Sequence, residues 1–233
     1  MTPPITGPDI SGWQPHFDLA EVAAAGHSFI GIKATEGLST SRLFGAQWDA
    51  AKSTPLFQFA YAFVRWDREN LTAQAKYLRA KVGPLEPGLL PPAADVEWLT
   101  DEHGEPVHLP PAVIANRART FLDTLDAEFG VEAMLYMPVA FWHDFLCAGG
   151  RPVPEALPLT KRILWAAGGV DKTDPTPMAG APDWRWTFRQ WTGKGRCPGI
   201  TNGRGDLVNV DLNWFAGSRA DLCALARLPE ARP

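Results

Sequence analysis

The sequence predicts an α/β fold, in which eight mostly parallel strands and fewer than eight helices form a modified, irregular TIM-like (β/α) barrel. Short runs of strand character alternate with helical stretches along the 233 residues, and eight such runs can be counted. Strands separated by helices imply right-handed crossovers and a parallel sheet, and eight strands suit a closed barrel. An open doubly wound sheet is the alternative. No repeat, low-complexity tract or linker divides the chain, so we expect residues 1–233 to form a single domain.

The first half of the chain contains four units of a strand followed by a helix. Apolar and alternating runs predict the strands, and the stretches between them have helical spacing. Asp18 is a favourable N-cap and Gly26 a favourable stop for the short helix between them. The apolar run 89–94 is typical of a buried strand. The expected strands are residues 5–10, 29–33, 57–63 and 89–97, and the expected helices are 18–26, 41–52, 69–82 and 111–129.

The second half is less regular. Apolar side chains form one helical stripe over residues 111–129, and Gly130 follows as its stop. Residues 168–183, which contain several prolines, and 193–205, which are rich in glycine, carry no helical pattern, so the last crossovers should be irregular. The expected strands are 133–137, 162–167, 186–191 and 207–212, and the expected helices are 139–147 and 218–228.

Composition limits the possible partners. The net charge is -4 and the basic residues are scattered, which argues against a nucleic-acid partner because phosphate binding needs clustered Lys and Arg. No run approaches the roughly 20 apolar residues of a membrane span, so we expect no membrane insertion. Cys147, Cys197 and Cys223 are odd in number and widely spaced, so we expect them to be mostly reduced. The five histidines lack ligand-like spacing, and we expect no metal site.

The tripeptide Asp95-Val96-Glu97 is the most informative motif. Two carboxylates that lie two residues apart on a strand point to the same face. Buried neighbouring carboxylates cannot both ionise cheaply, so one can stay protonated as a general acid while the other remains charged beside a sugar. The pattern therefore indicates glycoside cleavage. The alternative is an exposed acidic pair in a loop.

Other polar side chains fall at the expected ends of the strands. The active site of a barrel of this type lies at the C-terminal ends of its strands, because the connecting loops meet there. By strand parity Tyr61 and Phe63 share a face, whereas Ala62 and Val96 point toward the helices. Strand ends are also polar simply because they meet solvent, but so many in one mouth favour a site. The converging residues are Asp9, Lys33, Tyr61, Asp95, Glu97, Tyr136, Trp165, Gln190 and Asp211.

Ten tryptophans are unusual for a chain of this length. Large aromatic side chains often fill a core, but an exposed indole can stack on a pyranose ring while its N–H reaches a hydroxyl. Five tryptophans follow expected strand ends by a few residues and therefore predict a carbohydrate groove at the mouth. They are Trp13, Trp66, Trp98, Trp191 and Trp214.

Seven motifs, taken together and in order, resemble glycoside hydrolase family 25, the Chalaropsis-type lysozymes. The similarity extends from residue 7 to about residue 217. One position departs from the family pattern, because Ala62 stands where the family commonly has a histidine; that position should face the helices. The motifs are residues 7–14 (GPDISGWQ), 31–37 (GIKATEG), 59–63 (FAYAF), 95–97 (DVE), 135–136 (LY), 189–192 (RQWT) and 210–213 (VDLN).

The resemblance implies a modified barrel that hydrolyses the β-1,4 bond between N-acetylmuramic acid and N-acetylglucosamine in peptidoglycan, without metal or organic cofactor. It implies that Glu97 is the proton donor, with Asp95 beside it and Asp9 and Asp211 as the other two acids. Whether Asp95 attacks the sugar or orients the substrate's acetamido group stays open. The candidate substrate-binding residues are Tyr61, Phe63, Trp13, Trp66, Trp98, Tyr136, Trp165, Gln190, Trp191 and Lys33.

Two alternatives remain from the sequence: a binding protein that keeps the barrel but lacks turnover, and a glycosidase for chitin-like polymers. Closely placed carboxylates repel one another, and a protein that only binds a glycan does not need them, so the four acids favour an enzyme. For Lys33 and Glu36, we expect a structural ion pair at the mouth in preference to a direct role in catalysis.

The resemblance further implies that the protein acts in the cell wall, in the periplasm or outside cells. Residues 1–5 lack the features of a classical signal peptide, so we expect delivery by phage lysis, by a secretion machine or as part of a longer protein. The expected partner is the glycan strand of peptidoglycan, and we expect a monomer. No segment identifies an immunity or delivery partner.

Overall fold

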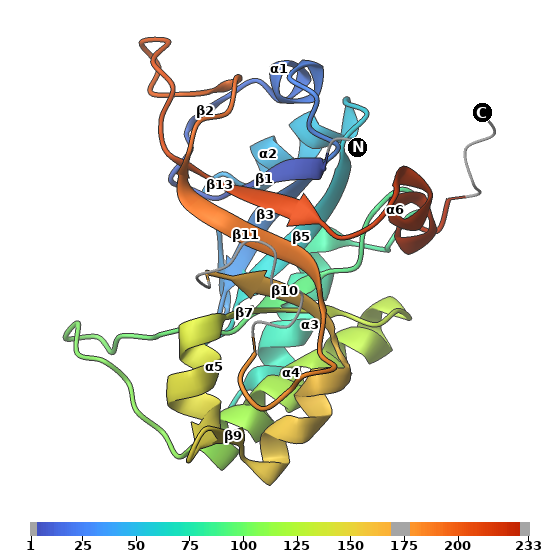
Figure 1. Ribbon diagram of the computed structural model, residues 1–233. Helices are drawn as coiled ribbons and strands as arrows, with labels where there is room; N and C mark the ends of the chain where they lie inside the picture. The colour runs from blue at the N-terminus through green and yellow to red at the C-terminus, as the bar shows by residue number, and fades with distance from the viewer. Residues whose placement is uncertain (1–3, 169–177, 229–233) are drawn as a thin grey trace.

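A closed barrel of eight strands forms the centre of the computed structural model, which describes residues 4–168 and 178–228 (Figure 1). The order around the barrel is β1, β3, β5, β6, β7, β10, β11, β13 and back to β1. The closed, mixed barrel confirms the predicted fold class over the open sheet. The barrel strands are β1 (Ile5–Ile10), β3 (Phe29–Glu36), β5 (Phe57–Phe63), β6 (Ala93–Asp95), β7 (Met134–Pro138), β10 (Ile163–Ala167), β11 (Trp186–Gly195) and β13 (Val210–Phe215).

One strand runs against the others. The arrow of β13 points opposite to that of β10 in Figure 1, and β13 pairs antiparallel with both β11 and β1. All other neighbouring pairs in the barrel are parallel. The reason is the missing crossover helix: β11 continues to Gly195, and the chain then returns through the short strand β12 (Ile200–Thr201), which pairs with β2 (His16–Phe17). A strand that returns without a crossover is antiparallel.

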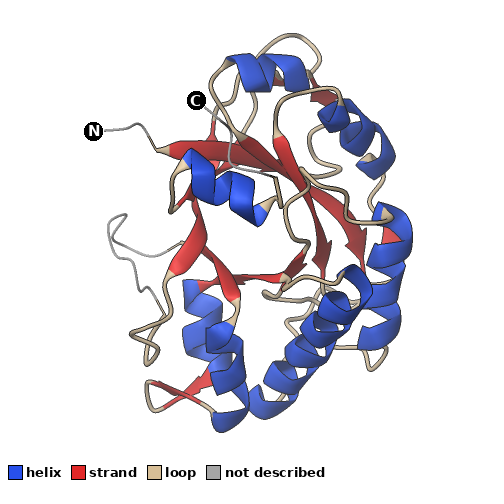
Figure 2. Cartoon of the chain, turned by 90° about the vertical axis from the view of Figure 1, so that its right-hand side faces the viewer, coloured by secondary structure: helices blue, strands red, loops and turns tan. Residues whose placement is uncertain are grey.

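Most helices lie outside the ring of strands, and one crosses the end of the barrel that faces the viewer in Figure 2. The longest, α4, has a proline in its first turn and ends at Gly130, whose φ of 70° is the left-handed conformation that favours glycine. Asp18 caps α1 as expected, because its Oδ1 accepts from two backbone N–H groups of the first turn. Within the described residues the helices are α1 (Leu19–Ala24), α2 (Phe44–Lys52), α3 (Leu71–Val82), α4 (Pro111–Phe129), α5 (Val139–Leu146), the 3₁₀ helix η1 (Pro154–Lys161) and α6 (Arg219–Leu225).

Two strands differ from their expected extents. The run 89–94 forms a strand only at Ala93–Asp95, because Pro91 and Pro92 have no backbone N–H for a ladder. The last strand begins at Val210 and not at residue 207. Two-residue strands flank the barrel: β4 (Ser39–Thr40), β8 (Cys147–Ala148) and β9 (Arg151–Pro152). Of the expected irregular segment 168–183, residues 169–177 lie outside the described part.

The barrel interior is filled by aromatic side chains. Phe59 contacts Trp165 edge to face at 5.2 Å between ring centroids, and Phe188 lies 5.9 Å from Phe59. At the end remote from the mouth, α6 packs against this interior cluster. Inward and outward positions alternate as predicted, so Ala62 belongs to the layer between strands and helices. Since the interior is a packed plug, polar groups have room only at the mouth.

The described chain has no helix with the length and apolar character needed to cross a bilayer. Cys147, Cys197 and Cys223 are free thiols.

Candidate active site

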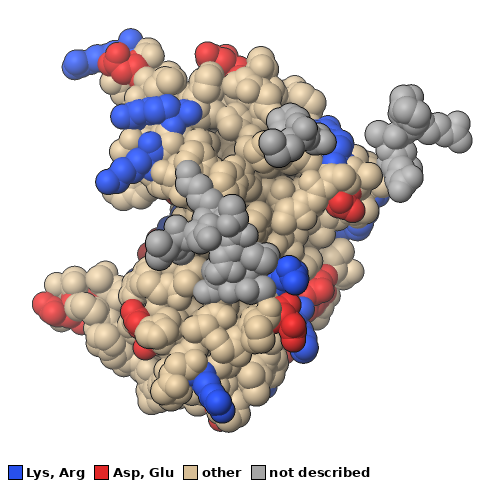
Figure 3. Space-filling model, viewed as in Figure 1, with Lys and Arg blue, Asp and Glu red and all other residues tan. Residues whose placement is uncertain are grey.

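Four carboxyl side chains meet at the mouth of the barrel, on the side toward which β10 points in Figure 1 and where the space-filling view is hollowed (Figure 3). Asp9 is near the end of β1 and Asp95 ends β6, and both are buried, with 4% and 6% exposure. Glu97 follows two residues after Asp95 and is partly exposed. Asp211, on β13, lies directly opposite Asp9 in the antiparallel register. The sequence prediction that these acids converge is confirmed.

The sequence predicts Asp211 at the mouth, where the structure places it, but the strand that carries it runs in the opposite direction to the one expected. We expected it near the C-terminal end of a parallel strand, but it is the second residue of the antiparallel strand β13. The start of an antiparallel strand and the ends of its parallel neighbours lie at the same edge of the sheet. Gly193 of β11 leaves the space for this carboxyl, since a Cβ there would lie 2.9 Å from Asp211 Oδ1.

The Glu97 carboxyl has the proton affinity that a general acid needs. Burial raises its pKa to about 7; the charge of Lys33 lowers the pKa, and that of Asp211 raises it. A carboxyl that titrates near 7 is still protonated in a large fraction of molecules at neutral pH, whereas an ordinary glutamate is ionised.

Asp95 lies deeper than Glu97. Burial, followed by the charge of Glu97, raises the pKa of Asp95 well above its usual range, while Lys33 lowers it. Its buried Oδ1 atom has no hydrogen-bond partner among the described residues. A buried polar atom without a partner is rare and calls for an explanation.

Asp9 is held by a hydrogen-bonded network. Its Oδ2 atom accepts from Asn213 Nδ2 at 2.8 Å and from Gln190 Nε2 at 3.2 Å. Tyr136 donates to Gln190 Oε1 at 3.0 Å, and Trp165 Nε1 donates to Asn213 Oδ1 at 2.7 Å. Burial and the charge of Asp211 nevertheless outweigh these donors and raise the pKa of Asp9 to about 8. Burial also raises the pKa of Asp211, to about 6.

Asn213 is the site residue that sequence reasoning missed. It is fully buried and bridges Trp165 to Asp9. A signal was present, because Asn213 lies two residues after Asp211 and strand parity puts both on the inner face.

The chain is similar to known proteins over most of its length. Residues 8–200 match the model of glycosyl hydrolases family 25. The chain belongs to this family. It is 31% identical to lysozyme M1 of Streptomyces globisporus over 95% of this chain and 71% of that protein. It is also 31% identical to an N,O-diacetylmuramidase of Arthroderma benhamiae, over 76% of this chain and 73% of that protein. The crystal structure of a lysozyme from Streptomyces coelicolor matches with a TM-score of 0.80 and 29% identity, covering 97% of this chain and 98% of that one.

Two aromatic residues of this family 25 barrel lie where no sugar can stack on them, so the sequence prediction for both is wrong. Trp66 is fully buried; its Nε1 donates to the backbone oxygen of Glu97 at 2.8 Å, and it packs near Phe141. Trp165 is 1% exposed and lies under Tyr136. For Trp66, proximity to a strand end does not reveal that its loop folds the side chain inward; Trp165 lies on β10 itself and points into the packed barrel interior. Both indoles support the site from behind.

The other aromatic candidates stay accessible or border the mouth. Trp13 is 87% exposed and Trp98 is 44% exposed. Trp191 stacks on Trp214 with ring centroids 5.5 Å apart. Tyr61, which donates to the backbone oxygen of Ile10 at 3.4 Å, and Tyr136 each show 7% of their surface.

Lys33 forms the predicted ion pair with Glu36, at 2.8 Å. Its ammonium also lies 4.5 Å from the ring centroid of Phe63. Because its charge lowers the pKa of both Glu97 and Asp95, Lys33 acts on the acids more directly than the sequence suggested. Over the described ranges, no group of three or more His, Cys, Asp or Glu side chains is arranged to hold a metal ion.

Proposed function

We propose that this family 25 enzyme is an N-acetylmuramidase, a lysozyme that cleaves the β-1,4 bond between N-acetylmuramic acid and N-acetylglucosamine in peptidoglycan. The observation that carries the proposal is a carboxyl with a pKa of about 7, Glu97, next to the buried Asp95 at the mouth of the barrel. The names of the relatives, a lysozyme and an N,O-diacetylmuramidase, support the substrate class.

In the proposed mechanism, Glu97 donates its proton to the glycosidic oxygen as the bond to the muramic acid carbon breaks. Asp95 carries the opposing charge: either its carboxylate bonds to that carbon, or it holds the acetamido group, whose oxygen then attacks. Water afterwards adds to the carbon and returns a proton to Glu97.

Asp9 and Asp211 have a supporting role in this proposal. The charge of Asp211 raises the pKa of Glu97, and the charge of Asp9 raises the pKa of Asp95. The first effect helps to keep the proton on Glu97 at neutral pH, whereas Asp95 must ionise before it can take its proposed role. Trp13 and Trp98 are exposed in the loops after β1 and β6 and can stack on sugar rings.

The proposed place of action is the bacterial cell wall, reached from the periplasm or from outside the cell, where the glycan strand is the partner. The enzyme should act as a monomer, since all four acids come from one chain. The delivery route stays a prediction from the sequence: phage lysis, a secretion machine or attachment to a longer protein.

Product analysis tests the proposed bond specificity. Purified peptidoglycan is digested, and the new reducing ends are reduced and identified. Muramic acid at the new ends is the expected result. Glucosamine at the new ends would indicate a glucosaminidase, and no new ends would indicate a binding protein; either outcome contradicts the proposal.

The Glu97→Gln variant tests the general acid. Glutamine keeps the shape of the side chain but has no proton to give, so we expect kcat to fall by at least about a hundredfold, with the midpoint of thermal unfolding almost unchanged. Glu102→Gln is the matched control, because Glu102 is exposed in the following loop. Near-normal turnover by Glu97→Gln would remove Glu97 from this role.

A further inference from the structure

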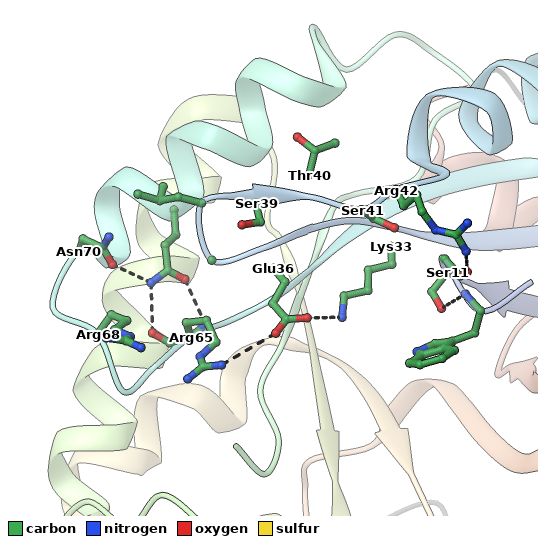
Figure 4. A pocket seen from close by; sticks show the side chains of 15 residues that line it. Ser11, Lys33, Glu36, Ser39, Thr40, Ser41, Arg42, Arg65, Arg68 and Asn70 are labelled. Carbon is green, nitrogen blue, oxygen red and sulfur yellow. Dashed lines mark hydrogen bonds and ion pairs between the residues drawn. The ribbon is translucent and has the colours of Figure 1, made fainter. Parts of the chain in front are cut away.

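A second cavity, of about 730 Å³, lies beside the acids and contains none of them in its wall. Figure 4 shows that its wall comes from the loop after β1, the β3–β4 hairpin and the loop after β5. These strands are neighbours in the barrel, so the cavity opens at the same end as the mouth. Lys33 belongs to both: it lines the cavity, and its charge acts on Glu97.

The cavity is rich in cations, and we call it the arginine pocket, defined by Arg42, Arg65 and Arg68 with Lys33. Arg42 lies at one end beside Ser11, and Arg65 and Arg68 lie at the other, with Lys33 between them (Figure 4). A chain with a net charge of -4 has thus placed four positive side chains around one hollow.

Two carboxylates compensate part of this charge. Asp67 accepts two hydrogen bonds from Arg65, at 2.9 and 2.8 Å, and pairs with Arg68 at 3.1 Å. Glu36 pairs with Lys33 at 2.8 Å and lies 3.9 Å from Arg65. Four cations against two carboxylates leave an excess of two positive charges.

The wall of the arginine pocket is held in place before any ligand arrives. Gln74 accepts from the backbone N–H of Arg65 and donates to its backbone oxygen, both at 3.1 Å. Gln74 also donates to Asn70 at 2.9 Å. At the other end, Arg42 donates to the backbone oxygen of Gly12 at 2.8 Å. Preorganised donors bind with a smaller entropy cost.

An uncharged sugar offers no negative charge to an excess of guanidinium groups, whereas the planar fork of arginine matches the two oxygens of a carboxylate. Peptidoglycan carries carboxylates on the short peptide that is joined to the lactyl group of muramic acid. A muramic acid seated at the mouth would have its peptide within reach of the adjoining pocket. We propose that the arginine pocket binds the carboxylates of this peptide, so that the enzyme prefers peptide-bearing chains. The inference rests on the proposed muramidase function.

The test compares two soluble substrates that lack phosphate polymers: glycan chains that carry their peptides, and the same chains after an amidase has removed them. The readout is the ratio of kcat/KM for the two. We expect wild type to prefer the peptide-bearing chains by about tenfold or more and to lose much of this preference at high salt, because exposed charge pairs are screened. In Arg42→Gln/Arg68→Gln the ratio should fall about tenfold.

Two controls separate charge from structure. Arg42→Lys/Arg68→Lys keeps both charges and should retain much of the preference. Arg185→Gln removes one exposed charge just before β11, at the opposite end of the barrel from the mouth, and should leave the ratio unchanged. A wild-type ratio near one, or an unchanged ratio in the double glutamine variant, would overturn the inference while leaving the muramidase proposal intact.

Two further outcomes are also decisive. If wild type hydrolyses neither substrate, the muramidase proposal fails. Calorimetric titration with the released soluble peptide then tests the arginine pocket by itself. Peptide binding that the double glutamine variant loses supports the inference about the pocket, and no binding overturns that inference. If the arginines accelerate only the digestion of walls that carry phosphodiester polymers, the pocket recognises phosphate, and the peptide assignment is wrong.

Discussion

The positive charge of Lys33 affects the pKa of the acids at the mouth in the opposite direction to burial and to the neighbouring carboxylates. Burial and neighbouring carboxylates raise the pKa of Glu97 and Asp95, while the Lys33 ammonium lowers both. Glu36 holds that ammonium at 2.8 Å and the ring of Phe63 lies beside it, so its position is well defined. Lys33 therefore sets how far the pKa of the proposed acid rises.

Removing this charge should move the pH profile. In Lys33→Met the pKa of Glu97 rises further, so the alkaline limb of kcat/KM, near pH 7 for wild type, should shift upward by about one pH unit. The profile is measured on soluble glycan chains, and Lys33→Arg, which keeps the charge, is the control. An unshifted limb in Lys33→Met, or a limb that moves to lower pH, would show that Lys33 does not tune Glu97.

Single residues also show how far the sequence alone could go. Asp9, Asp95, Glu97 and Asp211 could be assigned to one mouth because strand parity and strand ends are legible in the pattern of apolar residues. The sequence pattern does not predict the direction in which a loop side chain points. Trp66 is buried because the loop that carries it folds back toward α5, which depends on packing between distant segments.

At the scale of elements, β13 was the hardest part to predict. The pattern of residues 207–212 indicates a strand but contains no information on its direction. The glycine-rich stretch before it was recognised as lacking a helix, and that absence is the physical reason for the reversal: without a crossover the chain returns antiparallel. By contrast, α4 was predicted with its full extent because its apolar stripe and its stop at Gly130 are both local signals.

The loops after β5 and β6 are joined by the hydrogen bond from Trp66 to the Glu97 backbone, and this bond predicts a split between stability and activity. Trp66→Phe keeps an aromatic ring but leaves the part-buried carbonyl of Glu97 without this donor, so we expect a loss of about 1–3 kcal/mol in the free energy of unfolding. Glu97 should also be less well placed, and kcat should fall about tenfold. Urea unfolding and initial rates measure the two effects.

Trp142→Phe is the matched control for this prediction. Trp142 is also fully buried, and its Nε1 donates to the backbone oxygen of Ala179 at 2.9 Å, with no direct contact to the acids. Its replacement should destabilise the protein by a similar amount and leave kcat as in wild type. Equal losses of kcat in both variants would mean that Trp66 acts only through general stability.

At the scale of the whole molecule, the barrel separates an apolar end from an acidic one. Aromatic side chains and α6 fill the interior away from the mouth, and the four acids are concentrated at the other end. Burial raises the pKa of each of these acids. A folded state that binds protons more tightly than the unfolded chain loses stability as the pH rises.

Asp9→Asn tests this coupling between the site and global stability. The pKa of Asp9 rises from 3.8 to about 8 on folding, so its stabilising contribution is complete below pH 3.8 and is lost as the pH rises toward 8. Asparagine keeps an oxygen to accept from Asn213 and Gln190 but does not ionise. Relative to wild type, the variant should therefore gain on the order of 5 kcal/mol between pH 4 and pH 8, at about 1.4 kcal/mol for each pKa unit. Urea unfolding at pH 4, 6 and 8 measures the difference. The exposed Asp49→Asn should follow wild type, and a constant difference between Asp9→Asn and wild type at all three pH values would mean that ionising Asp9 does not destabilise the fold.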